Sequence, residues 1–169
     1  MRNIIKAGIL SDTHLTRPNR EFFDAVRQCF ADCEVIIHAG DLTDLSVLDA
    51  FADKTVHAVH GNCCGGTVRT ALPRECSFQV GNFTVGLLHG YNLGRYADNI
   101  ESGLWDVFPE ADCIIYGHTH EPVCKRVAGK LIINPGSFQL NNWYSSPCPY
   151  AVLEAGEELR GSLHEFSSG

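Results

Sequence analysis

The stretch NIIKAGILSDTH, residues 3–14, decides the fold, because it joins a hydrophobic run of strand length to a polar cluster. Two further apolar runs of strand length follow, EVIIHAG at 34–40 and TVHAVHG at 55–61. Helical patterns separate the three runs, one around 21–33 and a shorter one around 46–52. This alternation predicts a βαβαβ order and a parallel sheet.

The rest of the chain predicts a further sheet region. Residues 77–90 contain two strand-like runs around Gly81–Asn82, which is the signal of a two-residue hairpin. A helical pattern over 96–108 precedes another short strand, and residues 122–166 contain strands and turns alone. We therefore predict one mixed α/β domain that spans residues 1–169.

Composition and charge exclude several classes of protein. Hydrophobic residues make up 44% and charged residues 20% of the 169, as in an ordinary globular domain with one core. The net charge is −7 and no basic cluster exceeds Lys125–Arg126, which argues against a long nucleic acid as partner. The apolar runs are too short for a membrane span or a signal peptide, so we expect a cytoplasmic protein without a membrane partner. Trp105 and Phe108 are interpreted as core residues or as the face of a homo-oligomer.

The chain has eight cysteines but no CxxC pair and no signal of secretion, so we expect them to be reduced. Cys29 and Cys33 have the i, i+4 spacing of the first predicted helix. Cys76, Cys113 and Cys124 lie in apolar or strand-like runs, where a free cysteine behaves as a small hydrophobic residue.

Polar side chains end nearly every predicted strand of the first 120 residues. They are two Asp, one Asn and four His: Asp12, His14, Asp41, Asn62, His89, His118 and His120. Parallel strands bring their carboxyl ends to one edge of a sheet, where α/β folds build their sites. Oxygen and nitrogen donors of these kinds suit Mn, Fe, Zn, Ni or Co better than Mg or Ca.

Seven donors exceed the needs of one tetrahedral ion, but two ions that share a bridging carboxylate would use them all. Glycines at 40, 61, 90 and 117 would let the backbone approach such ions closely. The alternative is that these Asp and His residues only end strands and form hydrogen bonds. His38 and His57, inside apolar strands, are interpreted as core or sheet histidines.

Six sequence blocks carry a resemblance: SDTH, GDLTD, GNCC, LLHG, YGHTH and NPGS, in this order between residues 11 and 137. They resemble the metallophosphoesterase (calcineurin-like) superfamily. Within it, the short chain and the GHTHEP…NPGS ending are most similar to the small YfcE-like phosphodiesterases. The resemblance implies an αββα sandwich of two mixed sheets flanked by helices.

The resemblance also implies a dinuclear centre with two divalent ions, for which Mn is the first choice and Fe, Zn, Ni or Co are alternatives. It divides the ligands as follows: Asp12, His14 and His120 on one ion, Asn62, His89 and His118 on the other, and Asp41 bridging both. A hydroxide between the ions would attack phosphorus in line with the leaving oxygen of a small or nucleotide-like phosphodiester.

The GNCC block departs from the superfamily pattern. Asn62 and Cys63 are the catalytic candidates, since Cys63 stands where many members have a His that is thought to protonate the leaving group. Cys64 replaces the acidic residue that usually follows. Without that acid we expect a preference for good leaving groups, such as aryl esters. The thiol has other open roles, as a metal ligand, as an oxidisable group or as a small residue that fills a tight loop. His60 and Tyr91 also replace the usual Arg and His.

Two other functions stay open on sequence grounds. One is a catalytically poor interaction scaffold, as the retromer subunit that resembles these enzymes is thought to be. The other is a phosphomonoesterase that uses the same metals. Because every ligand position holds a competent donor, the sequence favours an enzyme. Arg95, Asp98 and Asn99 start the last predicted helix and are candidates for substrate contact or for a solvated helix end.

Overall fold

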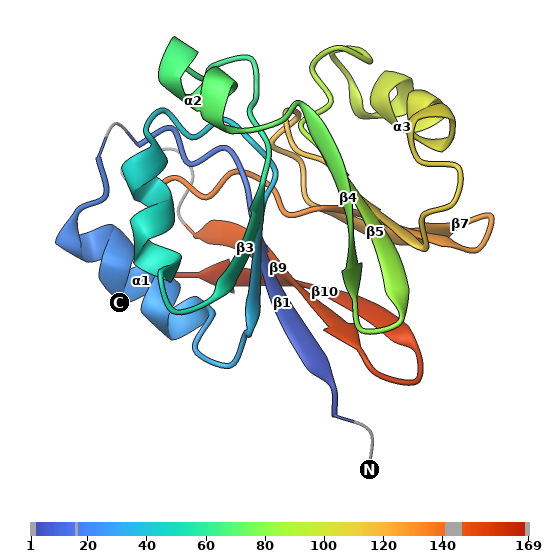
Figure 1. The fold of residues 1–169 in the computed structure, drawn as a ribbon, viewed down its shortest axis with the longest axis horizontal. Helices are drawn as coiled ribbons and strands as arrows, with labels where there is room; N and C mark the ends of the chain where they lie inside the picture. Colours follow the sequence, from blue (N-terminus) through green and yellow to red (C-terminus); the bar gives the residue numbers. More distant parts are fainter. Residues whose placement is uncertain (1–2, 16, 141–146, 168–169) are drawn as a thin grey trace.

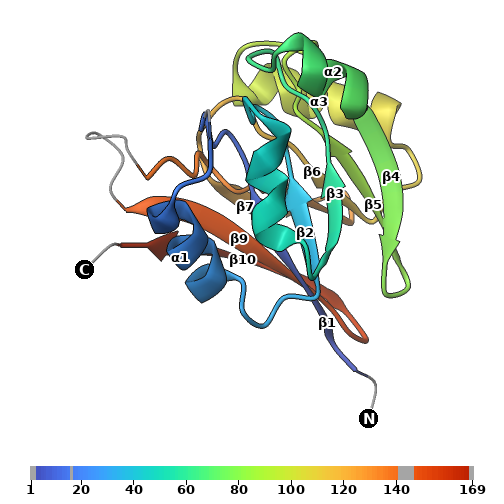
Figure 2. The ribbon, with the colours of Figure 1, turned by 60° about the vertical axis from the view of Figure 1, so that its left-hand side comes forward.

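The computed structural model describes residues 3–15, 17–140 and 147–167, which form two five-stranded sheets packed face to face (Figures 1 and 2). The first sheet has the order β10-β9-β1-β2-β3. Its strands are β1 (Ile5–Leu10), β2 (Val35–His38), β3 (Thr55–Ala58), β9 (Cys148–Ala155) and β10 (Leu159–Phe166). As predicted, β1, β2 and β3 are parallel, while β9 and β10 extend the sheet with antiparallel pairing.

The second sheet has the order β4-β5-β6-β8-β7. Its strands are β4 (Glu75–Val80), β5 (Phe83–Leu88), β6 (Cys113–Ile115), β7 (Val123–Val127) and β8 (Lys130–Asn134). Strands β5, β6 and β8 are parallel, and β4 and β7 pair antiparallel at the two edges. Both sheets are therefore mixed, as the resemblance implied.

Helical segments cover the outer faces of both sheets and complete an αββα sandwich. They are α1 (Arg20–Cys29), the 3-10 helix η1 (Leu45–Phe51), α2 (Gly66–Ala71) and α3 (Ala97–Val107). Figure 1 shows α1 and η1 on the side of the first sheet and α3 on the side of the second. Among the described residues no helix is both long and apolar enough to cross a membrane.

The alternation of side chains along each strand explains the four layers. In β1, Ala7 and Ile9 are buried between the sheets, while Leu10 belongs to the core beneath α1 and η1. In β6, Cys113 and Ile115 are buried between the sheets, and Ile114 belongs to the core beneath α3. Both strands thus have two apolar faces, which is why their runs lack polar alternation in the sequence.

A glycine on the outer face of each sheet admits a phenylalanine from the end of a helix. Phe30 follows α1 and its ring lies against Gly8 of β1, while Phe108 follows α3 and lies against Gly86 of β5. A Cβ atom at either glycine would overlap the ring. The two close contacts hold the helices near the sheets and so fix the thickness of the outer layers.

Most of the predicted elements are confirmed, with three corrections. The β4–β5 hairpin turns at Gly81–Asn82, where Gly81 has a φ of 59°. The prediction that Cys33 is helical is wrong, because the chain leaves α1 at Cys29 and turns so that β2 can pair with β1. The second helix is 3-10 rather than α, and α2 was not predicted. Cys76, Cys113 and Cys124 lie in strands as free thiols.

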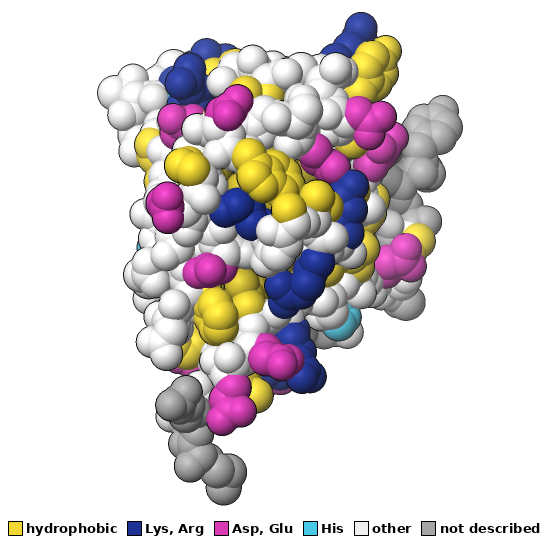
Figure 3. Space-filling view, turned by 90° about the vertical axis from the view of Figure 1, so that its right-hand side faces the viewer, with side chains coloured by type: hydrophobic (Ala, Val, Ile, Leu, Met, Phe, Trp, Pro, Cys, Tyr) yellow, Lys and Arg dark blue, Asp and Glu magenta, His cyan; other side chains and the backbone are white. Residues whose placement is uncertain are grey.

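Figure 3 shows the face formed by α3 and the β7–β8 hairpin, where hydrophobic side chains gather near the centre among charged ones. Trp105 of α3 is partly buried against the core beneath that helix, and it lines a small apolar pocket with Val127 and Ala128. Phe108 is buried in the same core. Both residues are therefore core residues, and Trp105 also reaches the surface.

Candidate metal centre

The seven predicted ligands converge at one end of the sandwich, where the carboxyl ends of strands from both sheets meet. The first sheet contributes residues after β1, β2 and β3, and the second sheet contributes residues after β5 and β6. In chain order they are Asp12, His14, Asp41, Asn62, His89, His118 and His120. The predicted edge is thus formed by two facing sheets rather than by one.

Two buried carboxylates form the middle of the cluster. His89 Nε2 lies 3.2 Å from Asp41 Oδ2 and 3.7 Å from Asp12 Oδ1. His120 Nε2 lies 3.2 Å from Asp12 Oδ1, and His14 Nε2 lies 3.8 Å from oxygens of both carboxylates. Three imidazoles therefore face the two carboxylates across distances that suit ligands of a shared ion.

Asn62 joins the remaining histidine to the cluster. Its Oδ1 atom lies 3.1 Å from His89 Nε2 and 3.2 Å from His118 Nδ1. Asp41 Oδ2 faces His14 on one side and His89 on the other. Asp12 Oδ1 likewise faces His14 and His120 as well as His89, so both carboxylates lie among histidines of the two ligand sets that the resemblance implies.

The chemistry of the donors fits a divalent cation. Asp12 Oδ1 and His14 Nε2 are both buried, and neither has a hydrogen-bond partner among the described residues. Buried polar atoms are rarely left unpaired, because the loss of solvation costs about 1–3 kcal/mol each. The ligand atoms of Asp12, His14 and His120 lie within 4.8 Å of one another, as do those of Asp12, Asp41 and His89. A cation would satisfy the unpaired atoms.

Hydrogen bonds set the form of the central imidazole. His89 Nδ1 lies 2.7 Å from the carbonyl oxygen of Ala39, which only accepts, so Nδ1 carries the proton. In the neutral ring the Nε2 lone pair then points at Asp41 and Asn62. Such an imidazole, oriented through its other nitrogen, is the usual form of a metal-binding histidine.

The backbone of the cluster is strained. Five of the seven predicted ligands have φ between 46° and 69°, a left-handed conformation that non-glycine residues rarely adopt. These five are Asp12, His14, Asp41, His118 and His120. Strain of this kind costs on the order of 1–3 kcal/mol per residue and gathers at functional sites, where it points side chains in a required direction.

Three of the four glycines noted in the sequence allow the ligands to come this close. A Cβ atom at Gly61 would overlap the Asp41 carboxylate, and one at Gly117 would overlap Ser11. At Gly40, whose φ is 99°, a Cβ atom would lie 2.7 Å from His89 Nδ1. Gly90 differs, because it lies against Ile100 of α3.

Two side chains of the NPGS block form hydrogen bonds to the loops that carry predicted ligands. Ser137 Oγ donates to the Asp12 carbonyl oxygen at 2.9 Å. Asn134 Nδ2 donates at 3.0 Å to the Gly117 carbonyl and to Thr119 Oγ1. Both side chains are buried, so they fix the loops that carry Asp12 and the two C-terminal histidines. The sequence marked this block as part of the family pattern without assigning these contacts.

The GNCC loop lies against the bridging carboxylate. The Cys63 backbone N–H donates to Asp41 Oδ1 at 2.8 Å, and the exposed thiol of Cys63 faces the cluster. Cys64 is buried, and its Sγ accepts from the Gly61 N–H at 3.1 Å. Arg69 of α2 donates to the carbonyl oxygens of Asn62 and Cys64 at 3.0 and 3.1 Å. Sequence reasoning missed Arg69, because α2 has no clear apolar periodicity.

The cluster shifts the ionisation of its members. Burial acts to raise the pKa of Asp41, but the hydrogen bond and charge of His89 outweigh it and lower that pKa. The pKa of His89 is raised despite burial, through the carboxylates of Asp41 and Asp12, and the close contact with the Asp12 carboxylate raises the pKa of His120. Burial, followed by the charge of His89, lowers the pKa of His118. When no metal ion is bound, protonated imidazoles therefore offset the negative charge of the carboxylates.

Burial and the Asp41 carboxylate raise the pKa of the Cys63 thiol, so this group keeps its proton until a cation lies beside it. The two substituted positions, His60 and Tyr91, lie close together with ring centroids 6.2 Å apart. The Tyr91 ring is also 6.2 Å from that of His89. Both residues therefore border the centre on the His89 side.

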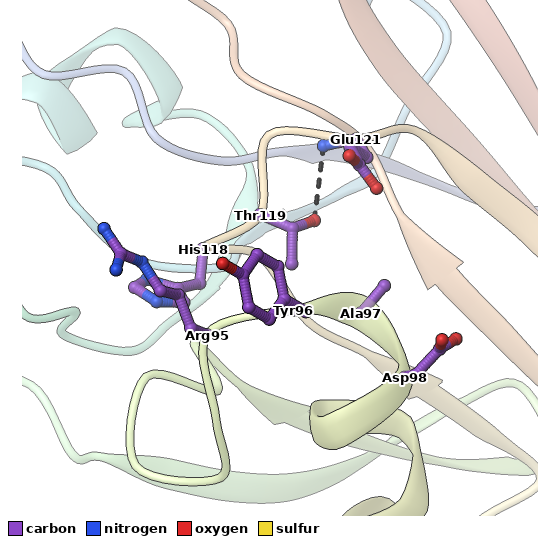
Figure 4. A pocket seen from close by; sticks show the side chains of 7 residues that line it. All are labelled: Arg95, Tyr96, Ala97, Asp98, His118, Thr119 and Glu121. Carbon is purple, nitrogen blue, oxygen red and sulfur yellow. Dashed lines mark hydrogen bonds between the residues drawn. The ribbon is translucent and has the colours of Figure 1, made fainter.

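An open pocket of about 490 Å³ begins at His118. Its lining residues are Arg95, Tyr96, Ala97, Asp98, His118, Thr119 and Glu121 (Figure 4). Figure 4 shows the Arg95 side chain next to His118 and the Tyr96 ring between Arg95 and Ala97. Of the three candidates for substrate contact, Arg95 and Asp98 line this pocket and Asn99 does not.

The two other strand histidines are structural, as predicted. His38 is fully buried, and both ring nitrogens have partners, with Thr13 Oγ1 at 3.2 Å and the Gly40 N–H at 3.1 Å. His57 stacks on Phe78, with ring centroids 3.7 Å apart. Neither ring reaches the metal centre.

Comparisons with known proteins agree with this architecture. Residues 5–158 match the model of the calcineurin-like phosphoesterase superfamily domain. A probable metallophosphoesterase of Methanothermobacter thermautotrophicus is 35% identical over 131 residues, which cover 77% of this chain and 75% of the relative. The phosphodiesterase MJ0936 of Methanocaldococcus jannaschii is 31% identical over 146 residues, which cover 78% and 83% of the two chains.

The solved structure of vacuolar protein sorting 29 from Cryptosporidium parvum has the same fold. It aligns with a TM-score of 0.74 over 98% of this chain and 99% of that one, at 18% identity. On the strength of the family match and the archaeal relatives, the chain belongs to the calcineurin-like phosphoesterase superfamily.

Proposed function

We propose that this protein is a phosphodiesterase that hydrolyses small or nucleotide-like phosphodiesters with the help of two divalent first-row ions, drawn from Mn²⁺, Fe²⁺, Zn²⁺, Ni²⁺ and Co²⁺. The observation that carries the proposal is the convergence of seven intact donors, two of them buried carboxylates, with Asp12 Oδ1 lacking a hydrogen-bond partner among the described residues. The archaeal relative named a phosphodiesterase supports the choice of a diester.

The ligands divide into the two sets that the resemblance implies. Asp12, His14 and His120 would hold one ion, Asn62, His89 and His118 the other, and Asp41 both. When bound, such ions lower the pKa of water towards neutrality and offset the charge of a phosphate group. Hydrogen bonds to the Ala39 carbonyl and from the Cys63 N–H keep His89 and Asp41 in place for this task.

The pocket beside His118 is where we place one organic group of the diester. Its volume of about 490 Å³ falls in the range of small-molecule sites. The Tyr96 ring is 68% exposed and offers a flat apolar surface for an aryl group or a base. The carboxylates of Asp98 and Glu121 outnumber the one guanidinium, that of Arg95, in the lining. This balance disfavours a second phosphate and favours an uncharged group.

The leaving group should be a good one. Cys63 stands where many members of the superfamily have a histidine that is thought to protonate the leaving group, and neither a thiol nor a thiolate donates a proton as readily as an imidazolium near neutral pH. Aryl phosphodiesters, whose leaving groups depart without protonation, should therefore be cleaved faster than alkyl phosphodiesters. Equal rates for the two, with chemistry rate-limiting, would contradict this expectation.

The proposal is tested by assaying an aryl phosphodiester and an aryl phosphomonoester with the purified protein, after chelation and after addition of Mn²⁺. We expect metal-dependent turnover with preference for the diester, and a loss of about a hundredfold or more in Asp41→Asn. The matched control is Asp53→Asn, which changes an exposed carboxylate at the opposite end of β3 and should retain wild-type activity. Preference for the monoester, or turnover that survives chelation, would refute the proposal.

A further inference from the structure

The thiol of Cys63 lies beside the metal centre. Cys63 Sγ, His14 Nε2 and a carboxylate oxygen of Asp41 are all within 4.8 Å of one another. Two ligands at about 2.1 and 2.3 Å from a tetrahedral ion are about 3.6 Å apart, and at most about 4.4 Å. Since the Cys63 side chain is exposed, a small rotation of that side chain closes the remaining gap.

The backbone holds this thiol in place. The Cys63 N–H bond to Asp41 Oδ1, at 2.8 Å, fixes the residue beside the bridging carboxylate. Asn62 Nδ2 is 3.6 Å from Cys63 Sγ, while Asn62 Oδ1 faces His89 and His118. The side chain of Asn62 therefore separates the thiol from the second ligand set and leaves the thiol on the His14 side.

An independent observation indicates a cation on that side. His14 Nε2 and Asp12 Oδ1 are the two buried side-chain atoms without a hydrogen-bond partner in the described part of the chain. They lie 3.8 Å apart, and the Asp12 side chain is fully buried. His14 Nε2, one of these two atoms, borders the space that the Cys63 thiol reaches.

We propose that Cys63 is a thiolate ligand of the ion on the His14 side, and that this ion is a thiophilic one such as Co²⁺, Zn²⁺ or Fe²⁺. Thiolate ligands select such ions over Mn²⁺, which prefers oxygen. Coordination forms one metal–sulfur bond and releases the thiol proton to solvent. A coordinated thiolate has no proton to donate, so Cys63 binds metal and does not protonate the leaving group. The inference rests on the metal centre of the proposed function but not on its substrate.

The neighbouring cysteine provides a matched control. Cys64 is buried in the core beneath α1 and η1, and its Sγ accepts the Gly61 N–H. A serine there keeps an acceptor for that hydrogen bond. Cys63→Ser and Cys64→Ser thus make the same chemical change at adjacent positions, one facing the centre and one facing the core.

The test is the absorption spectrum of the full chain after chelation and loading with Co²⁺ under reducing, oxygen-free conditions. Visible d–d bands report bound Co²⁺ whatever its ligands, and a near-ultraviolet charge-transfer band reports a thiolate ligand. We expect the charge-transfer band in the wild type and in Cys64→Ser, and its loss in Cys63→Ser. Competition with Mn²⁺ should show the preference of the centre for Zn²⁺ falling about tenfold or more in Cys63→Ser.

Each outcome decides a different point. Visible bands without a charge-transfer band in the wild type would overturn the thiolate ligand and leave the proposed phosphodiesterase standing. A charge-transfer band that persists in Cys63→Ser would also overturn it, since another cysteine would be the ligand. Absence of both bands in all three proteins would overturn the ligand and the metal centre together.

Discussion

Acid should destabilise this protein through one fully buried imidazole, that of His38. Its Nδ1 accepts the Gly40 N–H at 3.1 Å, so the single proton of the neutral ring sits on Nε2 and is shared with Thr13 Oγ1. A second proton on Nδ1 would point at the Gly40 N–H. Burial lowers the pKa of His38 from 6.5 to about 4.

The size of the effect follows from this difference. Below pH 6.5 His38 takes up a proton in the unfolded chain, but in the native state it stays neutral until the pH approaches 4. The free energy of unfolding therefore falls as the pH falls. A gap of about 2.5 pKa units corresponds to about 3 kcal/mol once the pH is below 4. At pH 5 the loss relative to pH 8 is about 2 kcal/mol.

The assay is urea denaturation at pH 8 and pH 5, with chelator present, of the wild type and of His38→Gln. The glutamine keeps one donor for Thr13 but does not titrate. The variant therefore lacks the pH-dependent contribution of His38 to the free energy of unfolding, whatever the stability of the variant at pH 8. We expect the wild type to lose about 2 kcal/mol more than the variant between the two pH values. The comparison between the two proteins cancels the contributions of the other titrating groups, including those of the metal centre.

An equal loss of stability in both proteins would refute the reasoning. It would mean that the His38 ring accepts a proton in the folded state. An NMR titration of the ring provides a second readout, since the account requires a neutral imidazole down to pH 5.

Three further predictions concern the helix contact, the pocket and the support of the centre. Gly86→Ala should cost about 1–3 kcal/mol in urea denaturation, because its Cβ would overlap the Phe108 ring; Gly65→Ala, where no atom lies within 4 Å of the new Cβ, should cost much less, and equal costs would contradict the packing. Tyr96→Ala should raise KM for an aryl diester about three- to tenfold with kcat nearly unchanged, as loss of ring stacking predicts; an unchanged KM would place the organic group elsewhere. Ser137→Ala, which removes a buried hydrogen bond to the metal-binding loop, should weaken Mn²⁺ binding about tenfold in equilibrium dialysis, and unaltered binding would show that the bond does not orient the ligands.

The sequence predicts which side chains meet at the candidate site, because each one follows a strand whose end can be recognised. Asp12 and Asp41 come after continuous apolar runs, which show no alternation of polar and apolar residues. Such runs are typical of parallel strands, whose carboxyl ends meet at one edge of the sheet. The same reasoning placed His89 and His118 at that edge, but only the family resemblance implied that they lie on a second sheet that faces the first. The left-handed backbone of Asp12 and Asp41 also has no sequence signal, since nothing around them requires it apart from the ligand geometry.

Other features were not predicted from the sequence, because they depend on contacts between residues that are distant in the chain. Segment 66–71 has too few apolar residues to predict a helix, yet it forms α2 and places Arg69 on the carbonyls of the GNCC loop. The end of α1 at Cys29 depends on the pairing of β2 with β1, which the local pattern around Cys33 does not show. The role of Ser137 depends on a hydrogen bond to Asp12, 125 residues away.

The central claim is that seven side chains at one end of the sandwich hold two divalent ions. Elemental analysis after loading and exhaustive dialysis tests it most directly, with the wild type beside Asp41→Asn and the exposed control Asp53→Asn. The account predicts two ions per chain in the wild type and in the control, and fewer in Asp41→Asn, because its bridging carboxylate is lost. A wild-type protein that retains no ion, or an Asp41→Asn variant that retains two, would contradict it.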